Sequence, residues 1–398
     1  MTVFPLNRLG SVCERVSVGH VGKTSPYYQD SGIPFLRTQN VGEGYLLLKE
    51  MKYVSTDFHE KLSKSQIRGG DVLISRVISD RVNCAVIPED FGEANCANVI
   101  LVRPGSKLDP KYFVHFISSP IAQRQLLRCR VGSAQSVVNT KVVESWLIPL
   151  PRIEEQRRIA AILDKADAVR RKRQQAIALT EELLRAAFLE MFGDSVTNPK
   201  GWEVCQLKDF STIQSGIAKG KKIDRSKAVS IPYMRVANVQ DGYLDLSEIK
   251  TLEILPTDID KYILREGDLL LTEGGDPDKL GRGAIWYGKI QPCVHQNHIF
   301  CVRPDQTLAE PEYLSALIGS ERGKRYFLQA AKQTTGIATI NKTQLYGFPA
   351  FLPPLYLQQK YTQIVKVIRS TRTKLDDKYE QTDKFFNSLL QRAFSGKL

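Results

Sequence analysis

The residues best suited to chemistry form a short cluster made of Cys293, His295, His298 and Cys301. Imidazole and thiolate are the ligands that zinc prefers, but the spacing is not that of a zinc finger. When Val302-Arg303-Pro304 is aligned with the earlier Val102-Arg103-Pro104, Asn98 and Leu101 stand opposite His298 and Cys301. Because the first copy could not hold the metal, a strand entering a sheet is the favoured interpretation, and no metal site is predicted.

Two further motifs suggest catalysis only superficially. Glu50-x-Lys52 recurs as Glu248-x-Lys250, but a nuclease site of this type needs a second acidic residue on a preceding strand to complete a hard-cation site. No convincing upstream Pro-Asp accompanies either copy, so a strand with alternating exposed charge is favoured. Gly22-Lys23-Thr24 lacks the glycine that a phosphate loop requires five residues earlier. The sequence therefore predicts a chain without a catalytic site and without a cofactor.

The net charge favours nucleic acid as a partner. The 398 residues include 56 Lys+Arg and 43 Asp+Glu, a formal net charge of +13. Such a surface attracts polyanions, although a merely basic protein is the alternative. No apolar stretch is long enough to span a membrane, and the start lacks the layout of a secretory signal. Seven cysteines without a C-x-x-C pair favour a reducing cytoplasm as the location.

The elements that would position a binding site occur twice along the chain. Ile33-Pro34-Phe35-Leu36-Arg37 returns as Ile231-Pro232-Tyr233-Met234-Arg235, and Gly70-Asp71-Val72-Leu73 returns as Gly267-Asp268-Leu269-Leu270. In our alignment Gln156 matches Gln359 and Ala187-Phe188 matches Ala393-Phe394, so the offset drifts from about 197 to about 206. Halves of about 200 residues are too long for solenoid repeats. They predict a duplicated unit, each copy consisting of a mixed domain followed by a helix.

A helical pattern begins after a proline-bearing hinge in each half. No proline or glycine interrupts the chain from Ile153 to about Phe192. Apolar or small residues show a three–four alternation there, broken at Arg173, and the second helix shows the same alternation, broken at Lys378. The predicted seams are Ile159, Ile162, Ala166, Val169, Ala176, Thr180, Leu183 and Ala187, and Tyr361, Ile364, Ile368, Thr371, Leu375, Thr382, Phe385 and Leu389. This spacing predicts a coiled coil, with amphipathic helices lying on their own domains as the alternative. Gly193 and Gly396 are the predicted helix stops.

The order of these motifs resembles that of the specificity subunits of type I restriction-modification systems. The matching features are G-Y-L after an Asn-Val strand, the G-D-[VL]-L strand, and an Asn-x-x-x-[VL] turn before a proline-rich exit. Residues 148–159 resemble that family's entry into its first conserved helix, and residues 393–398 resemble its usual C-terminus. One departure is the segment 351–359, which lacks the acidic residue before the glutamine.

The layout and the resemblance together predict an α+β fold with two similar mixed α/β target-recognition domains, joined by two long helices in an antiparallel coiled coil. We expect the domains at residues 1–150 and 198–352, and the spacer helices at residues 151–197 and 353–398. The resemblance implies binding to an asymmetric, two-part site in double-stranded DNA. It also implies methyltransferase and restriction subunits as partners, which would carry the methylation and cleavage activities, and no membrane. The alternatives are a self-contained enzyme that modifies or cuts DNA, and a structural protein that binds DNA without sequence preference.

Affinity for DNA is expected from Lys and Arg on phosphates, and specificity from side chains at base edges. The best candidates lie in polar loops after the two G-D-x-L strands. These loops differ between the halves, as readers of different half-sites should, with solvated hairpins as the alternative. A basic loop suits phosphates, and the arginines of the repeated I-P-[FY]-[LM]-R strand are either structural or phosphate-contacting. The candidates are Arg76, Ser79 and Arg81 in the first loop, Lys279 and Arg282 in the second, Lys219, Lys221 and Lys222 in the basic loop, and Arg37 and Arg235 in the repeated strand.

Overall fold

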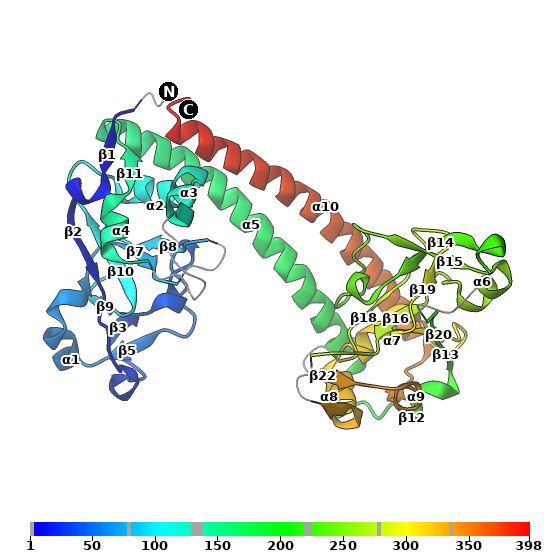
Figure 1. Ribbon diagram of the computed structural model, residues 1–398. Helices are drawn as coiled ribbons and strands as arrows, with labels where there is room; N and C mark the ends of the chain where they lie inside the picture. Colours follow the sequence, from blue (N-terminus) through cyan, green and yellow to red (C-terminus); the bar gives the residue numbers. More distant parts are fainter. Residues whose placement is uncertain (1–3, 78–80, 129–137, 219–223, 277–279, 335–336) are drawn as a thin grey trace. The chain divides into compact units, whose positions relative to one another are not determined.

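The computed structural model describes residues 4–77, 81–128, 138–218, 224–276, 280–334 and 337–398 (Figure 1). By its internal contacts the chain divides into two compact units. Residues 1–176 and 375–398 form the first unit, and residues 177–374 form the second. Each unit contains one mixed α/β domain and a part of each of two long helices.

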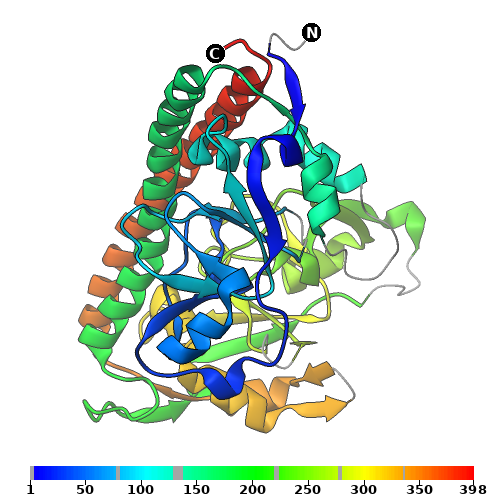
Figure 2. The ribbon, with the colours of Figure 1, turned by 90° about the vertical axis from the view of Figure 1, so that its left-hand side faces the viewer.

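The first domain is built on two sheets (Figure 2). The larger sheet has the strand order β2–β10–β7–β8–β4, and its strands are Cys13–Val18, Val99–Pro104, Val72–Ser75, Cys84–Val86 and Glu43–Gly44. Every residue of β7 is buried, which is typical of a strand covered on both faces. The second sheet has the order β5–β3–β9–β6, with strands Lys52–Val54, Ile33–Leu36, Ala94–Cys96 and Gln66–Ile67.

The helices of the first domain obey local signals. They are α1 (Thr56–Lys61), α2 (Pro110–Ser118), α3 (Pro120–Arg128) and α4 (Thr140–Ser145). The Asp109 side chain caps α2 by accepting from the backbone N–H of Lys111 and Tyr112, and Pro110 stands at the first helical position, where its missing N–H costs nothing. A short antiparallel ladder of β1 (Leu6–Arg8) and β11 (Leu147–Pro149) closes the domain.

The second domain repeats this plan. Its larger sheet has the order β13–β20–β16–β18, with strands Ser211–Ser215, Ile299–Pro304, Leu269–Thr272 and Gly283–Ile285. A second sheet has the order β15–β14–β19, with strands Lys250–Ile254, Val229–Met234 and Val294–His295. The closing ladder consists of β12 (Val204–Gln206) and β23 (Pro349–Phe351). The helices are α6 (Pro256–Tyr262), α7 (Pro311–Ile318), α8 (Glu321–Ala330) and α9 (Lys342–Tyr346).

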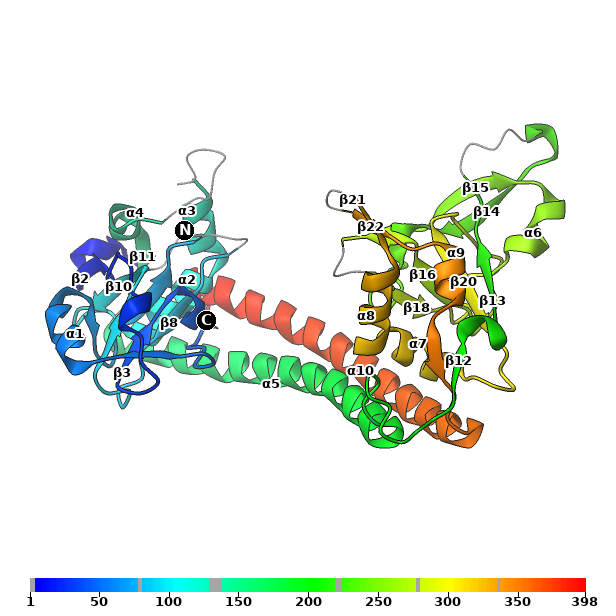
Figure 3. The ribbon, with the colours of Figure 1, turned by 90° about the horizontal axis from the view of Figure 1, so that it is seen from below.

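One sheet of the second domain has no counterpart among the described residues of the first. It has the order β17–β22–β21, with strands Gly274–Gly275, Ile337–Thr339 and Lys332–Thr334. β17 comes directly after β16, and the hairpin of β21 and β22 comes after α8 (Figure 3). Gly274 and Gly275, just after the G-D-L-L strand, therefore belong to this additional sheet.

Two long helices, α5 (Ile153–Phe192) and α10 (Leu355–Phe394), have 40 residues each. They run antiparallel in both units. In the first unit, Arg170 lies 3.6 Å from Asp383 and Arg158 donates to the Leu398 carbonyl at 3.0 Å. In the second unit, Glu181 pairs with Arg372 at 2.6 Å. Gly193, at φ 84°, ends α5 as predicted.

At several positions of the helix seams, the buried residue is the one that follows the predicted residue. On α10, Tyr361, Ile368 and Leu389 are buried as predicted, but Val365 is buried in place of Ile364 and Phe386 in place of Phe385. On α5, Ile159 is buried as predicted, but Leu163, Asp167, Arg170 and Phe188 are buried one position beyond the predicted Ile162, Ala166, Val169 and Ala187. The steps of three and four residues can follow one another in either order along a helix, and each order gives a different set of buried residues. Packing against both the domain and the partner helix selects the set that is observed. The two residues at the predicted breaks in the seams, Arg173 and Lys378, are in contact. Arg173 donates to the Lys378 carbonyl at 2.5 Å.

An aromatic cluster joins the domain to the long helices in each unit. In the first unit, the rings of Tyr112 and Phe116 lie 5.1 and 5.5 Å from that of Phe394, the last residue of α10. In the second unit, the Tyr313 ring lies 4.7 Å from that of Phe192, the last residue of α5. Each domain therefore rests on the end of one long helix and on the start of the other. Among the described residues, no helix is long and apolar enough to cross a membrane.

Candidate nucleic-acid interface

The repeated motifs pair with each other inside each domain. Asp71, of the first G-D-x-L strand, accepts from Arg103 Nε and Nη2 at 2.7 and 2.8 Å. Asp268 accepts from the same atoms of Arg303 at 2.6 Å each. Both aspartates have a side-chain exposure of 1%, and such bidentate pairs are the strong ones. The G-D-x-L and V-R-P motifs therefore form the internal framework of the domains.

The arginines of the repeated I-P-[FY]-[LM]-R strand are also engaged internally. Arg37 donates through Nη2 to the Glu50 carbonyl at 2.9 Å, and its backbone N–H donates to the Asn40 side chain at 3.0 Å. Arg235 makes the same two bonds to Glu248 and Asn238, at 2.9 and 3.0 Å. Of the two alternatives for these arginines, the contacts support a structural role. A phosphate contact by either one stays a prediction.

The Glu-x-Lys motif belongs to this arrangement. The Glu248 carboxylate lies 3.1 Å from Arg235 Nη2 and 3.4 Å from Lys250 Nζ. Hydrogen bonds from these two cations lower the pKa of Glu248. The Glu248 carboxylate is therefore paired with the neighbouring cations Arg235 and Lys250, as in an ordinary surface ion pair.

One glutamine fastens the entry of each long helix. Gln156 accepts from the Asp109 backbone N–H at 2.9 Å and donates to the carbonyls of Lys107 and Pro151. In the second unit, Gln358 makes the equivalent bonds to Glu310, Leu308 and Pro353.

The matching residue is thus Gln358, and our alignment of Gln156 with Gln359 was wrong by one position. The helix ends also correct our alignment of Ala187-Phe188 with Ala393-Phe394. Phe192 and Phe394 are the last residues of α5 and α10 and match each other with the same offset of 202. Adjacent glutamines at 358 and 359 made the two registers indistinguishable in the sequence.

The candidate loops lie at equivalent positions after β7 and β16. Arg76, the first residue after β7, is partly buried, and its carbonyl accepts from the Val138 backbone N–H at 2.9 Å. Arg282 stands just before β18, and its Nη1 donates to Gln240 at 3.3 Å. Arg81 is exposed. Ser79, Lys219, Lys221, Lys222 and Lys279 lie outside the described residues, so their assignment to the interface stays a prediction.

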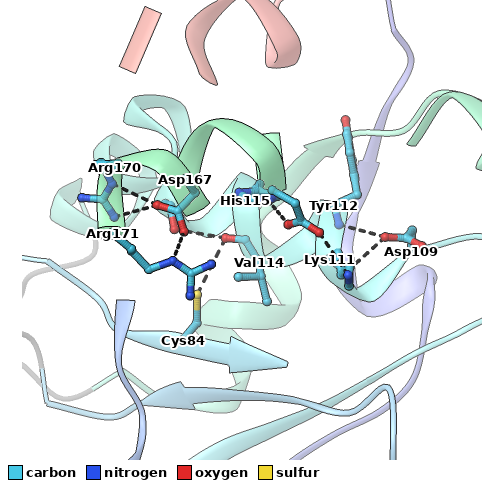
Figure 4. Close-up of polar contacts among 11 residues, drawn as sticks. Cys84, Asp109, Lys111, Tyr112, Val114, His115, Asp167, Arg170 and Arg171 are labelled. Carbon is cyan, nitrogen blue, oxygen red and sulfur yellow. Dashed lines mark hydrogen bonds and ion pairs between the residues drawn. The ribbon is translucent and has the colours of Figure 1, made fainter. Parts of the chain in front are cut away.

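Arg81 borders a cavity of the first unit, which has a volume of about 380 Å³. α2, α5 and α10 all contribute to its walls. The charged side chains that line it are Glu43, Arg81, Lys111, Asp164, Asp167, Arg170, Arg171 and Asp383, together with His115. Asp167 lies between Arg170 and Arg171 at 2.9 Å from each (Figure 4). Both acidic and basic groups line the cavity, so it lacks the uniform positive charge that favours binding of a phosphate backbone.

The cysteine–histidine cluster is divided between two strands and a surface pair. His295 lies in β19 and Cys301 in β20, as the strand interpretation predicted. Burial raises the pKa of Cys293 to about 12, which disfavours the thiolate that zinc requires. The exposed His298 lies 2.7 Å from the Glu273 carboxylate. Within the described ranges, no group of three such residues is placed to hold a metal ion.

The duplicated domains on paired long helices define a class of two-domain proteins in which scaffold and variable loops are separate. At the level of sequence, residues 6–179 and 199–381 each match the family model described as Type I restriction modification DNA specificity domain. The two matches cover most of the chain, and the chain therefore belongs to this family. The predicted family resemblance and fold class are confirmed.

Curated relatives carry the corresponding names. A putative type I restriction enzyme MjaX specificity subunit from Methanocaldococcus jannaschii is 28% identical over 199 residues, which is 50% of this chain but only 46% of that relative. The type I restriction enzyme EcoKI specificity subunit of Escherichia coli strain K12 is 21% identical over 401 residues, covering 94% of this chain and 84% of the relative. These names are those of specificity subunits, in agreement with the predicted absence of a catalytic role.

The fold is also found in solved structures. The S subunit of a type I restriction-modification system from M. genitalium has a TM-score of 0.57 at 12% identity, with 99% of this chain and 96% of that chain covered. At this level of identity the likeness concerns the fold alone.

Proposed function

We propose that this chain recognises an asymmetric DNA site in two separate parts and directs methyltransferase and restriction subunits to it. The observation that carries the proposal is the division between repeated and unrepeated residues. The residues that form the framework recur in both domains, including the pairs Asp71–Arg103 and Asp268–Arg303. The loops after β7 and β16 follow equivalent strands but differ in sequence.

That division is what a reader of two different half-sites needs. Base edges are distinguished by side chains that differ from site to site, whereas the fold that presents them can be the same. Arg76 and Arg81 would act in the first domain and Lys279 and Arg282 in the second. Lys219, Lys221 and Lys222 would contact phosphates, which fix the register of the protein on the duplex.

The proposal is tested by sequencing the methylome of cells that carry this chain with its partner subunits. One split motif, methylated in both of its parts on opposite strands, is expected. Methylation spread over unrelated sequences would support the structural DNA-binding alternative instead. The purified chain alone should neither methylate nor cleave DNA, and turnover by it would support the alternative of a self-contained enzyme.

A further inference from the structure

The first domain meets α5 through an acid on the helix and two bases on the domain. Asp164 of α5 lies 3.0 Å from Lys111 Nζ and 2.7 Å from His115 Nε2. Lys111 and His115 stand one turn apart on α2, so both face the same carboxylate (Figure 4). Burial raises the pKa of Asp164, but the hydrogen bonds from His115 and Lys111 outweigh it and leave that pKa below its ordinary value. The face of α5 is therefore acidic where α2 rests on it.

The second unit has the opposite charges at the same two positions. The matching positions are set by equivalent bonds. Tyr112 and Tyr313 donate to the carbonyls of Pro149 and Phe351 at 2.7 Å, and Gln156 and Gln358 fasten the helix entries. The residue before the tyrosine is Lys111 in the first domain and Glu312 in the second. The residue eight positions after the glutamine is Asp164 on α5 and Lys366 on α10.

The surroundings of Glu312 agree with this reversal. Its side chain is buried, with a relative exposure of 7%. Burial raises the pKa of Glu312, the charge of Lys366 lowers it, and the neighbouring Glu310 and Glu266 raise it. The domain thus carries an acidic residue at this position, and α10 carries Lys366 where α5 carries Asp164.

A second pair of matching positions contributes less. Asp167 of α5 corresponds to Arg369 of α10, which lies over the Tyr287 ring at 5.1 Å. Asp167 is already paired with Arg170 and Arg171 of its own helix. Its charge is largely compensated, and the difference between the two interfaces therefore rests on the first pair of positions.

We propose that these reversed charges match each recognition domain to the long helix that follows it in the sequence. We call this charge-dependent matching of domain and helix keying. The face of α5 accepts a domain with a cation at the position of Lys111, and the face of α10 accepts a domain with an anion at the position of Glu312. If the domains were exchanged, Glu312 would face Asp164 and Lys111 would face Lys366. A buried Glu312 carboxylate facing Asp164 is unfavourable, because burial reduces the screening of like charges, whereas Lys111 and Lys366 are exposed and their repulsion contributes less.

The keying restricts which domains can be joined to which helix. Under the function proposed above, it fixes which of the two DNA half-sites is read from the start of α5 and which from the start of α10. This consequence for DNA rests on the proposed function, whereas the keying itself rests on the fold and is measured without DNA.

The first experiment reverses the charges at one interface of the full-length chain. Lys111→Glu and Asp164→Lys should each lower the midpoint of thermal unfolding, by about 2–4 °C. The combination of Lys111→Glu, His115→Ala and Asp164→Lys reproduces the second interface, where Ala316 matches His115. It should regain most of the loss. Lys165→Glu, at an exposed position of the same helix, makes the same change in net charge as Lys111→Glu and should leave the midpoint nearly unchanged.

The second experiment exchanges residues 1–150 and 198–352 within the full-length chain. This chain should unfold at a lower temperature than the same exchange combined with Asp164→Lys and Lys366→Asp. Equal midpoints for the two exchanged chains would overturn the proposal. So would a triple variant at the first interface that is no more stable than Asp164→Lys alone, a result obtainable even where the exchanged chains do not fold. Because these readouts are thermal, they stand apart from any failure of the DNA-recognition proposal.

Discussion

At the scale of single residues, the motifs that identify the chain serve the fold. The bond from Arg103 joins the strand β10 to Asp71, the residue just before β7, across 32 positions of the sequence. Asp71 also accepts from the Arg68 backbone N–H at 2.9 Å, so the carboxylate is fully committed. Removal of the arginine would leave a buried charge without its cation.

Arg103→Ala should therefore lower the free energy of unfolding of the first unit by about 2–3 kcal/mol. This is less than a fully buried pair would lose, because Arg103 retains 19% side-chain exposure. Arg68→Ala is the matched control, since Arg68 and Glu14 form an exposed pair whose loss should cost about 1 kcal/mol or less. Urea unfolding of the full-length chain measures both, and equal effects of the two variants would contradict the framework role.

Asp164 predicts a dependence of stability on pH. Its folded-state pKa lies below the ordinary value, so it stabilises the folded chain while the carboxylate is ionised. That contribution is present above about pH 5 and is lost as the pH falls below about 4 toward the folded-state pKa. Wild type should unfold at a higher temperature than Asp164→Asn at pH 7, and the difference should shrink at about pH 3. Asp90→Asn, at an exposed turn, is the control, and a difference that does not change with pH would contradict this role.

Substitution of Arg282 should affect DNA recognition, whereas substitution of Arg235 should affect the stability of the fold. Arg282→Ala should weaken discrimination at one half-site by roughly 1–3 kcal/mol and leave the other half-site unchanged. Arg235→Ala should lower the thermal midpoint instead, because Arg235 holds Glu248 within the domain. Competition binding with single-base variants of the site, carried out with the partner subunits, measures the first effect. An equal loss on all sequences would assign Arg282 to a phosphate.

At the scale of elements, the two long helices carry both domains. A helix of 40 residues is about 60 Å long at 1.5 Å per residue. Part of that length is needed to dock the domains, and we expect the rest to correspond to a separation on the order of one turn of DNA, about 34–36 Å. Because the helices pair antiparallel in each unit, a change of length requires matched insertions in both.

Four residues inserted after Leu179 and four after Lys374 should lengthen the unread spacer of the DNA site. Each insertion adds about 6 Å and rotates the remainder of the helix by about 40°, which resembles one or two base pairs of about 3.4 Å and 35° each. Methylome sequencing should find the same half-sites with a spacer longer by one or two. The same four residues inserted after Gly92, in an exposed turn, should leave the spacer as it was. An active variant with an unchanged spacer would show that the helices do not set it.

At the scale of the whole molecule, the chain consists of two copies of the same unit, a mixed α/β domain followed by a long helix. The offset of 202 between Gln156 and Gln358 is maintained to the helix ends, so the two domain–helix junctions are built alike. Their framework bonds coincide, while their loops and their interface charges differ. Equivalent junctions with different loops are the basis for treating each domain as a module.

Replacement of residues 1–150 by the first domain of a family member should change one half-site and leave the other intact. The donor should carry a cation at the position of Lys111, because Asp164 faces it. A donor with an anion there is the matched comparison and should give a less stable chain with the same change of half-site. Methylomes in which both half-sites change together would contradict the modular arrangement.

Much of this could be predicted from the sequence by itself, because the signals are local. A run without proline or glycine located α5 at its observed bounds, Ile153 to Phe192, and the repeated motifs predicted two equivalent domains. The order of those motifs indicated the family. Periodicity and backbone restrictions act over a few residues, so a single sequence displays them.

Which of those residues meet depends on contacts between distant segments of the folded chain. The tertiary structure paired Asp71 with Arg103, directed Arg37 and Arg235 into their own domains, and moved several positions of the helix seams by one residue. It also placed Asp164 opposite Lys111 and His115. Hydrogen bonds and ion pairs depend on distances between segments far apart in the chain, and the spacing of residues along one sequence does not contain those distances.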